Sequence, residues 1–256
     1  MQNPEYIYKT YSQKVFNLAY RMTGNKDDAD DITQETFILA FKSLDKFKGK
    51  SDIYTWLYTI AKNNCLKFLD KKKKSSFLAL QELIDKAGSP VSELLPEDEK
   101  LLYISQVKDG CLSGLLRCLS LQQRLAFILN ILLDLPLEQV ASIIGKSENA
   151  ARILVHRSKQ NIKEFLCCNC SLYDSKNPCR CESLINFSLK QGWIGKEKIL
   201  FKDSVRIESE ISSLKNVVNL YKSLNEQKPS DVLNKDIQSI LSNHKDFLIF
   251  NEKKVK

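Results

Sequence analysis

The chain has 256 residues, 43% of them hydrophobic, so it is long enough for about two or three compact domains and is not a wholly disordered polymer. Its 39 Lys and Arg residues against 31 Asp and Glu residues give a net charge of +8, which favours a polyanionic partner but does not by itself establish one. No apolar run reaches the roughly 18 to 20 residues that cross a bilayer, and the first residues lack the basic and then apolar pattern of a signal peptide. We therefore expect a cytoplasmic protein with no membrane partner.

The spacing of apolar residues predicts helices almost throughout. Spacings of three and four recur along most of the chain, and alternation with period two is rare. This pattern indicates an all-α fold with two small helical domains, a linker between them, and a Cys-rich, helical C-terminal extension. The expected boundaries are 1–74 for the first domain, 75–110 for the linker, 111–166 for the second domain, 167–195 for the cysteine-rich segment and 196–256 for the extension.

An acidic helix start stands out in the first domain. Five carboxylates lie between Asp27 and Glu35, where negative charge complements the positive end of a helix dipole. Asp28, Asp31 and Glu35 share one helix face, while an apolar face continues along the same helix from Phe37. Taken in isolation, the segment is most simply read as a solvated helix start.

Two longer strings change that interpretation. They are DADDITQETFILAF, which begins at Asp28, and FKGKSDIYTWLYTIAKNN, which begins at Phe47. Together they resemble the second conserved region of sigma-70 family proteins. In that family the acidic helix docks on a coiled coil of the largest catalytic subunit of RNA polymerase. The resemblance implies polymerase-binding roles for Asp28, Asp31, Gln34 and Glu35.

The segment from Lys42 to Lys74 combines ten lysines and three aspartates with several aromatic residues. Such a mixture suits single-stranded DNA, because cations bind phosphates and unstacked bases lie on aromatic faces. Helical spacing equally allows Trp56 to pack inward, with Ser51 or Asp52 capping its helix. The sigma resemblance implies that this segment captures a flipped base and the melted strand of the minus-ten element. The residues assigned to that contact are Lys46, Phe47, Lys48, Lys50, Ser51, Trp56, Lys62, Asn63 and Asn64.

A helix-turn-helix pattern occupies the second domain. A short helix after Leu135 ends at Gly145, and Ser147 is placed to cap a second helix that runs to about Phe165. Polar residues on the second helix are spaced to face the major groove or its phosphates. The preceding string LSLQQRLAF resembles the opening of sigma region 4, and two sigma regions joined by a short linker are typical of the extracytoplasmic-function (ECF) group. The DNA-binding residues expected here are Arg124, on the DNA backbone, and Asn149, Arg152, His156, Arg157 and Lys159.

Five of the eight cysteines lie between Cys167 and Cys181, on either side of a turn expected at Asn177. Thiolates on both sides of a turn match a tetrahedral zinc site, while a redox switch and inert thiols are the alternatives. The string CSLYDSKNPCRC also resembles cysteine-rich extensions of some ECF sigma factors, including ones controlled directly by metals. The expected zinc ligands are Cys167, Cys170, Cys179 and Cys181, with Cys168 in reserve, and Cys65, Cys111 and Cys118 are expected in the core.

The chain lacks the marks of an enzyme, because neither histidine belongs to a visible catalytic constellation and no phosphate-binding glycine loop is present. The leading hypothesis is a sigma factor that binds core RNA polymerase and promoter DNA, with an anti-sigma factor as a further partner. The alternative is a helix-turn-helix regulator that binds duplex DNA without polymerase and uses the cysteines as a sensor. Beyond Gly195, apolar spacing from Ile207 to Tyr221 predicts an amphipathic helix.

Overall fold

The computed structural model describes residues 3–47, 49, 51–70, 77–87, 95–195, 217–222 and 228–243. The described residues form helices, turns and loops, with one isolated β-bridge between Cys170 and Cys179, so the predicted all-α fold is confirmed. They group into two compact units, one of residues 1–72, 142–145 and 226–256, the other of residues 73–141 and 146–225. None of the helices in the described ranges combines the length and apolar character of a membrane span.

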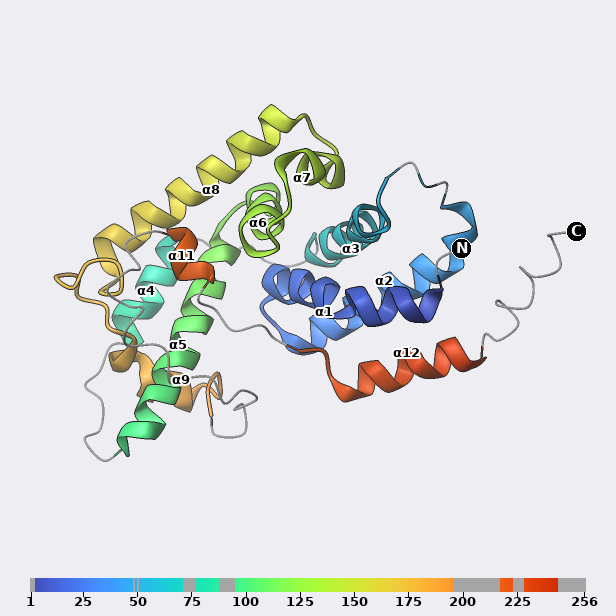
Figure 1. The fold of residues 1–256 in the computed structure, drawn as a ribbon. Helices are drawn as coiled ribbons and strands as arrows, with labels where there is room; N and C mark the ends of the chain where they lie inside the picture. The colour runs from blue at the N-terminus through green and yellow to red at the C-terminus, as the bar shows by residue number, and fades with distance from the viewer. Residues whose placement is uncertain are drawn as a thin grey trace, which may run out of the picture. The chain divides into compact units, whose positions relative to one another are not determined.

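The first unit is built from three helices that share one core. Phe16, Phe37 and Leu57 come one from each helix and are at most 1% exposed. A fourth helix from the end of the chain lies against the second of the three (Figure 1). The elements are α1 (Pro4–Thr23), α2 (Lys26–Lys42), the 3-10 helix η1 (Leu44–Lys46), α3 (Ile53–Leu69) and α12 (Asp231–Asn243).

Side-chain caps fix where the first helices begin. The Asn25 Oδ1 atom accepts a hydrogen bond from the Asp28 amide at 2.9 Å, so α2 starts at the acidic run as predicted. Gly24, with φ of 72°, ends α1 in the left-handed conformation that glycine adopts without strain. Asp52 stands at the N-cap of α3, one of the two positions expected, but its side chain makes no capping hydrogen bond.

The second unit has its core between α5, α6, the π turn η2 and α8. Leu115, Leu125, Phe127 and Ile162 are 0% exposed there. The helix α5 runs without a break across the linker boundary expected at residue 111. The helix α7 contributes residues to both units. The elements are α4 (Phe77–Ala87), α5 (Glu97–Cys118), α6 (Leu121–Phe127), η2 (Ile128–Leu132), α7 (Leu137–Ile144), α8 (Glu148–Asn169), the 3-10 helix η3 (Cys181–Leu184), α9 (Ile185–Lys190) and α11 (Val217–Lys222).

The helix-turn-helix forms at the residues that the sequence indicated. Gly145 follows α7 with φ of 71°, and the Ser147 hydroxyl accepts a hydrogen bond from the Ala150 amide at 3.2 Å at the start of α8. The helix α8 continues past Phe165 to Asn169. The cysteine-rich segment therefore begins inside the last turn of the recognition helix.

Part of the predicted amphipathic helix near the end of the chain is described. Val217–Lys222 forms α11, and Tyr221 is 1% exposed, with its hydroxyl donating to the Leu112 carbonyl oxygen at 2.9 Å. The helix is thus part of the second unit. Several residues of the sequence predictions lie outside the described residues, namely Lys48, Lys50, the run 71–74, Ile207, Ile211 and Leu214.

Candidate functional site

The acidic surface of α2 is the first candidate site. Asp31 and Glu35 are exposed, and Asp28 and Gln34 are half-buried, so all four predicted polymerase-binding residues reach the surface of one helix. The opposite side of α2 is buried through Ile32 and Phe37. The charged residues are therefore presented by a helix whose position is set by the core.

The helix α12 packs against α2, the helix that carries this acidic surface. The Ser230 amide donates to the Asp30 carboxylate at 3.1 Å, and the Gln34 side-chain amide donates to Asp236 at 3.5 Å. On the neighbouring α1, the Tyr8 hydroxyl donates to Asn234 at 2.7 Å. Burial, and then the charge of Asp30, raise the pKa of Tyr8 to about 12. Sequence reasoning gave no sign of this contact.

The predicted single-strand surface combines exposed polar residues with a half-exposed aromatic pair. Lys46, Ser51 and Asn63 are exposed. The rings of Phe47 and Trp56, both half-buried, lie 5.1 Å apart between centroids at an angle of 41°. Trp56 thus packs on Phe47 and still exposes part of its ring.

Two other residues of this surface also have roles within the fold. The Asn64 side-chain amide donates to the Thr36 hydroxyl at 3.1 Å and so links α3 to α2. Lys62 is half-buried, and burial lowers the pKa of its ammonium group. Both remain partly accessible on the same helix as Trp56.

The second helix of the helix-turn-helix presents a polar row. Its buried side carries Ala151, Val155 and Ile162, at most 5% exposed. Arg152 pairs with Glu148 one turn earlier at 2.8 Å, with both side chains largely exposed, so the pair contributes little to stability. The residues that the sequence assigned to DNA contact lie opposite the core: Asn149, Arg152, His156 and Arg157 are exposed, and Lys159 is half-buried.

Arg124 does not belong to this row. Its side chain is 6% exposed, and its guanidinium donates to the carbonyl oxygens of Leu116 at 3.0 Å and Arg117 at 2.7 Å. These carbonyls belong to the last turn of α5, where backbone donors become few, although the Leu116 oxygen also accepts from the Leu119 amide at 3.1 Å. The expected contact with the DNA backbone is corrected accordingly: Arg124 joins α6 to the end of α5 inside the domain.

The cysteine-rich segment is a tight hairpin. The Ser171 amide donates to the Cys179 carbonyl oxygen at 3.0 Å, and the Cys179 amide to that of Asn169 at 3.1 Å. The predicted turn at Asn177 is present, and its side-chain amide reaches the carbonyl oxygens of Cys167 at 2.9 Å and Cys170 at 3.1 Å. Asn177 therefore satisfies the open end of α8 and holds the two halves of the hairpin together.

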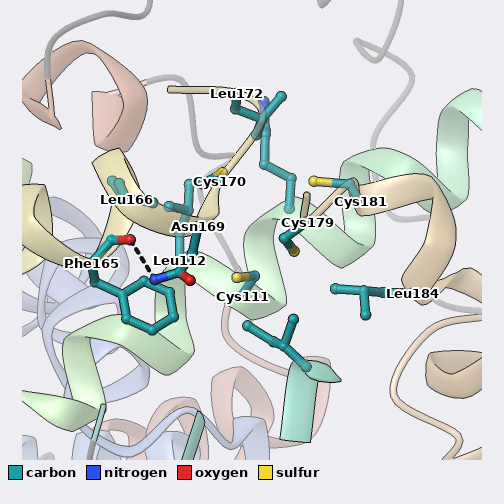
Figure 2. A pocket seen from close by; sticks show the side chains of 12 residues that line it. Cys111, Leu112, Phe165, Leu166, Asn169, Cys170, Leu172, Cys179, Cys181 and Leu184 are labelled. Carbon is teal, nitrogen blue, oxygen red and sulfur yellow. Dashed lines mark hydrogen bonds between the residues drawn. The ribbon is translucent and has the colours of Figure 1, made fainter. Parts of the chain in front are cut away.

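Four cysteines line a small pocket in the second unit (Figure 2). Cys170, Cys179 and Cys181 come from the hairpin and Cys111 comes from α5, and the cavity measures about 20 Å³. Burial, and then the charges of Cys181, Cys170 and Cys179, raise the pKa of the Cys111 thiol well above its usual range. Burial also raises the pKa of Cys181 to about 12 and that of Cys179 to about 11. Cys111, expected to be an ordinary core residue, thus lies beside three of the predicted ligands.

Cys167, the fourth predicted ligand, is placed elsewhere. Cys167 and Cys168 are exposed on the last turn of α8, with their sulfur atoms 3.6 Å apart, and neither lines the pocket. Within the described part of the chain, no group of three or more His, Cys, Asp or Glu side chains is arranged so that it could hold a metal ion. Cys65 is 0% exposed, as predicted for a core residue.

Two models of known protein families match this chain in two separate stretches. Residues 7–75 match the family model for sigma-70 region 2, and residues 109–162 match that for sigma-70 region 4. The RNA polymerase sigma factor YlaC of Bacillus subtilis is 30% identical over 161 residues, which cover 62% of this chain and 90% of YlaC. The ECF RNA polymerase sigma factor SigE of Mycolicibacterium smegmatis is 28% identical over 160 residues, covering 62% of this chain and 60% of SigE.

The chain belongs to the sigma-70 family, and several of the relatives it matches are named ECF RNA polymerase sigma factors. Among solved structures, the sigma factor RpoE of Bartonella quintana, crystallised with the anti-sigma factor NepR, is 21% identical, with a TM-score of 0.45 over 63% of this chain and 95% of that one. Both family models end before the cysteine hairpin, so the hairpin and α12 lie beyond the two matched regions.

Proposed function

We propose that this ECF sigma factor works in the cytoplasm, where it binds core RNA polymerase through α2 and reads promoters through α3 and α8. The observation that carries the proposal is the division of each of these helices into a buried side and a polar, exposed side within its own unit. The phosphodiester chemistry belongs to the polymerase. An anti-sigma factor stays a prediction from the sequence.

On α2 the polymerase would meet the acidic residues Asp28, Asp31, Gln34 and Glu35. Opposite charges across such an interface mainly accelerate docking and select the partner. Because Asp31 and Glu35 are exposed, their charge is available to a partner without any change in the core. A regulator that binds duplex DNA alone would not need an acidic face for polymerase docking.

At the minus-ten element, an unpaired base would stack on the Phe47 and Trp56 pair while neighbouring lysines contact phosphates. Base stacking on aromatic residues contributes about 1 to 3 kcal/mol per base. At the minus-thirty-five element, Asn149, Arg152, His156 and Arg157 of α8 would reach base edges or phosphates. Ile153, 43% exposed beside them, would contact thymine methyl groups.

The cysteine hairpin would hold one zinc-like ion through Cys170, Cys179 and Cys181. Three thiols that line one pocket on either side of a hairpin supply most of a tetrahedral thiolate site. The fourth ligand expected from the sequence, Cys167, is exposed on α8 and does not line the pocket that the other three cysteines share. The identity of the fourth ligand is therefore a separate question.

Reconstituted transcription tests the proposal. Core polymerase should retain the purified chain on a sizing column and, with it, should initiate from specific promoters in genomic DNA fragments. The matched control is the double variant Asp31→Lys, Glu35→Lys, which should fold and fail to be retained. A wild-type chain that protects duplex DNA from nuclease but neither binds nor activates polymerase would instead establish the polymerase-independent regulator.

A further inference from the structure

We infer that Cys111 of α5 is the fourth thiolate of a zinc-type site formed with Cys170, Cys179 and Cys181. The inference rests on the proposed metal-binding function of the hairpin and names a ligand that the sequence does not indicate. Cys111 lies on a helix of sigma region 4, and the other three cysteines follow that region in the chain. The site would therefore clip the hairpin onto the promoter-reading domain.

The first support is the position of the thiols. All four line one cavity, whose volume of about 20 Å³ is close to that of a single water-sized species. A cysteine sulfur is placed by one torsion angle, χ1, so each of these thiols can change direction without a shift of the backbone. The isolated β-bridge between the backbones of Cys170 and Cys179 already fixes the main chain on two sides of the cavity.

The second support is the backbone around Cys170. The Tyr173 amide donates to the Cys170 carbonyl oxygen at 3.0 Å, and the Asn177 side-chain amide donates to the same oxygen at 3.1 Å. These bonds hold Cys170 beside the cavity before any ion binds.

The third support is a buried cation beside the thiols. Lys108 is 5% exposed and lines the same cavity. A divalent ion with four thiolates carries a net charge of −2, and a neighbouring ammonium group offsets part of that charge in a buried site.

The hairpin is also held against α5 from outside the cavity. Lys100 of α5 forms an ion pair with Glu182, next to Cys181. Farther along, Gln106 of α5 exchanges two hydrogen bonds with the backbone of Gly195, which follows α9, at 2.9 and 3.2 Å. The ion pair therefore ties the residue after Cys181 to α5 before any ion binds, which lowers the ordering cost of binding.

The test is metal-dependent protection of thiols in the reduced full-length protein. Alkylation followed by mass spectrometry, with and without one equivalent of Zn²⁺, should show protection of Cys111, Cys170, Cys179 and Cys181. Cys167 and Cys168 should react equally in both samples. Protection of Cys167 with a metal-insensitive Cys111 would overturn the assignment.

Variants give a second, independent measure. Cys111→Ser should weaken Co²⁺ binding by more than about tenfold, since even the loss of a residue behind a ligand costs about 10- to 100-fold. It should also remove the absorption bands of a four-thiolate cobalt site. Cys167→Ser and Cys118→Ser are the controls and should bind as wild type, with circular dichroism confirming equal helix content. A wild-type chain without metal uptake would refute the metal function itself, whereas a four-thiolate spectrum in Cys111→Ser would refute only this ligand.

We further propose, from separate contacts, that α12 is a removable cover on the polymerase-binding helix. This proposal rests on the polymerase-binding role of α2. Leu233 and Ile237 of α12 are at most 3% exposed, and their helix is tied to Asp30 and Gln34 of α2. Gln34 is one of the four residues assigned to the polymerase contact, so the two partners compete for it.

The contacts of α12 and the residue before it include two buried apolar side chains and three hydrogen bonds, one of them at the long distance of 3.5 Å. Polymerase would bind only the fraction of molecules from which α12 has detached, so any change that detaches α12 raises the apparent affinity.

Polymerase affinity of full-length variants tests the cover. Ile237→Asp should raise the affinity by at least about threefold, because it increases the binding-competent fraction. Val232→Asp places the same charge on the exposed side of the helix, where the native side chain is 66% exposed, and should bind as wild type. Equal affinity of all three chains would refute the cover and leave polymerase binding intact, while no binding by any of them would refute the function of α2 and the cover with it.

Discussion

The Nε atom of Arg124 donates to the carbonyl oxygen of Leu116 at 3.0 Å, across the junction between α5 and α6. The same guanidinium reaches Arg117 and Leu119, at 2.7 and 3.5 Å. One side chain thus satisfies several carbonyls at the end of α5, and its charge is compensated by their dipoles. The charged group of this arginine therefore binds carbonyl oxygens inside the domain and does not face DNA.

Arg124→Ala should therefore destabilise the protein by about 2 to 3 kcal/mol, because buried carbonyls lose charged hydrogen-bond donors. Chemical denaturation with a helix-sensitive signal measures this loss. Promoter binding by the folded fraction should keep its dependence on salt concentration, since no phosphate contact is lost. Unchanged stability with a reduced salt dependence would return Arg124 to the DNA interface.

Reversing the charge at Asp31 and Glu35 should weaken polymerase binding without changing stability. Both side chains are exposed, so Asp31→Lys with Glu35→Lys removes a complementary charge and leaves the core untouched. Glu82→Lys with Glu164→Lys, at two other exposed positions, makes the same change of net charge and is the control. Equal loss of binding in both double variants would show that only overall charge matters.

Replacing Arg152 or Arg157 by Ala should impair use of the minus-thirty-five element with little effect on folding. A lost base contact costs about 1 to 3 kcal/mol and relaxes the sequence preference at one position, whereas a lost phosphate contact lowers the salt slope by about one. Arg180→Ala, at an exposed position in the hairpin, matches the charge change. Footprints and salt titrations of the three variants separate the outcomes, and identical behaviour would exclude α8 as the reader.

Gly145→Ala should destabilise the helix-turn-helix by about 1 to 2 kcal/mol, because its φ of 71° belongs to the left-handed region that disfavours a Cβ atom. No atom lies within 4 Å of the added Cβ, so the cost comes from the backbone and not from a clash. Gly145→Asn should lose less, since asparagine tolerates this conformation better. Equal stability of the two variants in thermal melts would contradict this explanation.

Trp56 should report binding of the melted strand directly. The chain has two tryptophans, so Trp193→Phe leaves Trp56 as the single indole fluorophore. Minus-ten single-stranded DNA added with core polymerase should quench the fluorescence that remains after subtraction of an identical complex of the Trp56→Phe, Trp193→Phe variant, as a base stacks on the ring. Duplex DNA of the same sequence is the control, and equal quenching by both, or by neither, would remove Trp56 from the single-strand contact.

The sequence determined the features that depend on near neighbours in the chain. Ser147 caps α8 where it was expected to, Gly145 ends α7, α2 begins at the predicted acidic run, and the acidic and polar helix faces appear at the predicted spacing. Each of these depends on hydrogen bonds or periodicity within a few residues, and local rules describe such interactions well. The sigma regions were recognised for the same reason, because their motifs are continuous strings.

Tertiary structure alone decided which distant residues share a site. Cys111 joins the hairpin cysteines because α5 packs against η3, and Cys167 leaves them because α8 extends by another turn. Arg124 turns inward toward carbonyls that a sequence does not show as unsatisfied, and α12 meets Asp30 about 200 residues away in the chain. Contacts of this kind follow from how helices pack, and helical periodicity tells which face is buried but not which partner buries it.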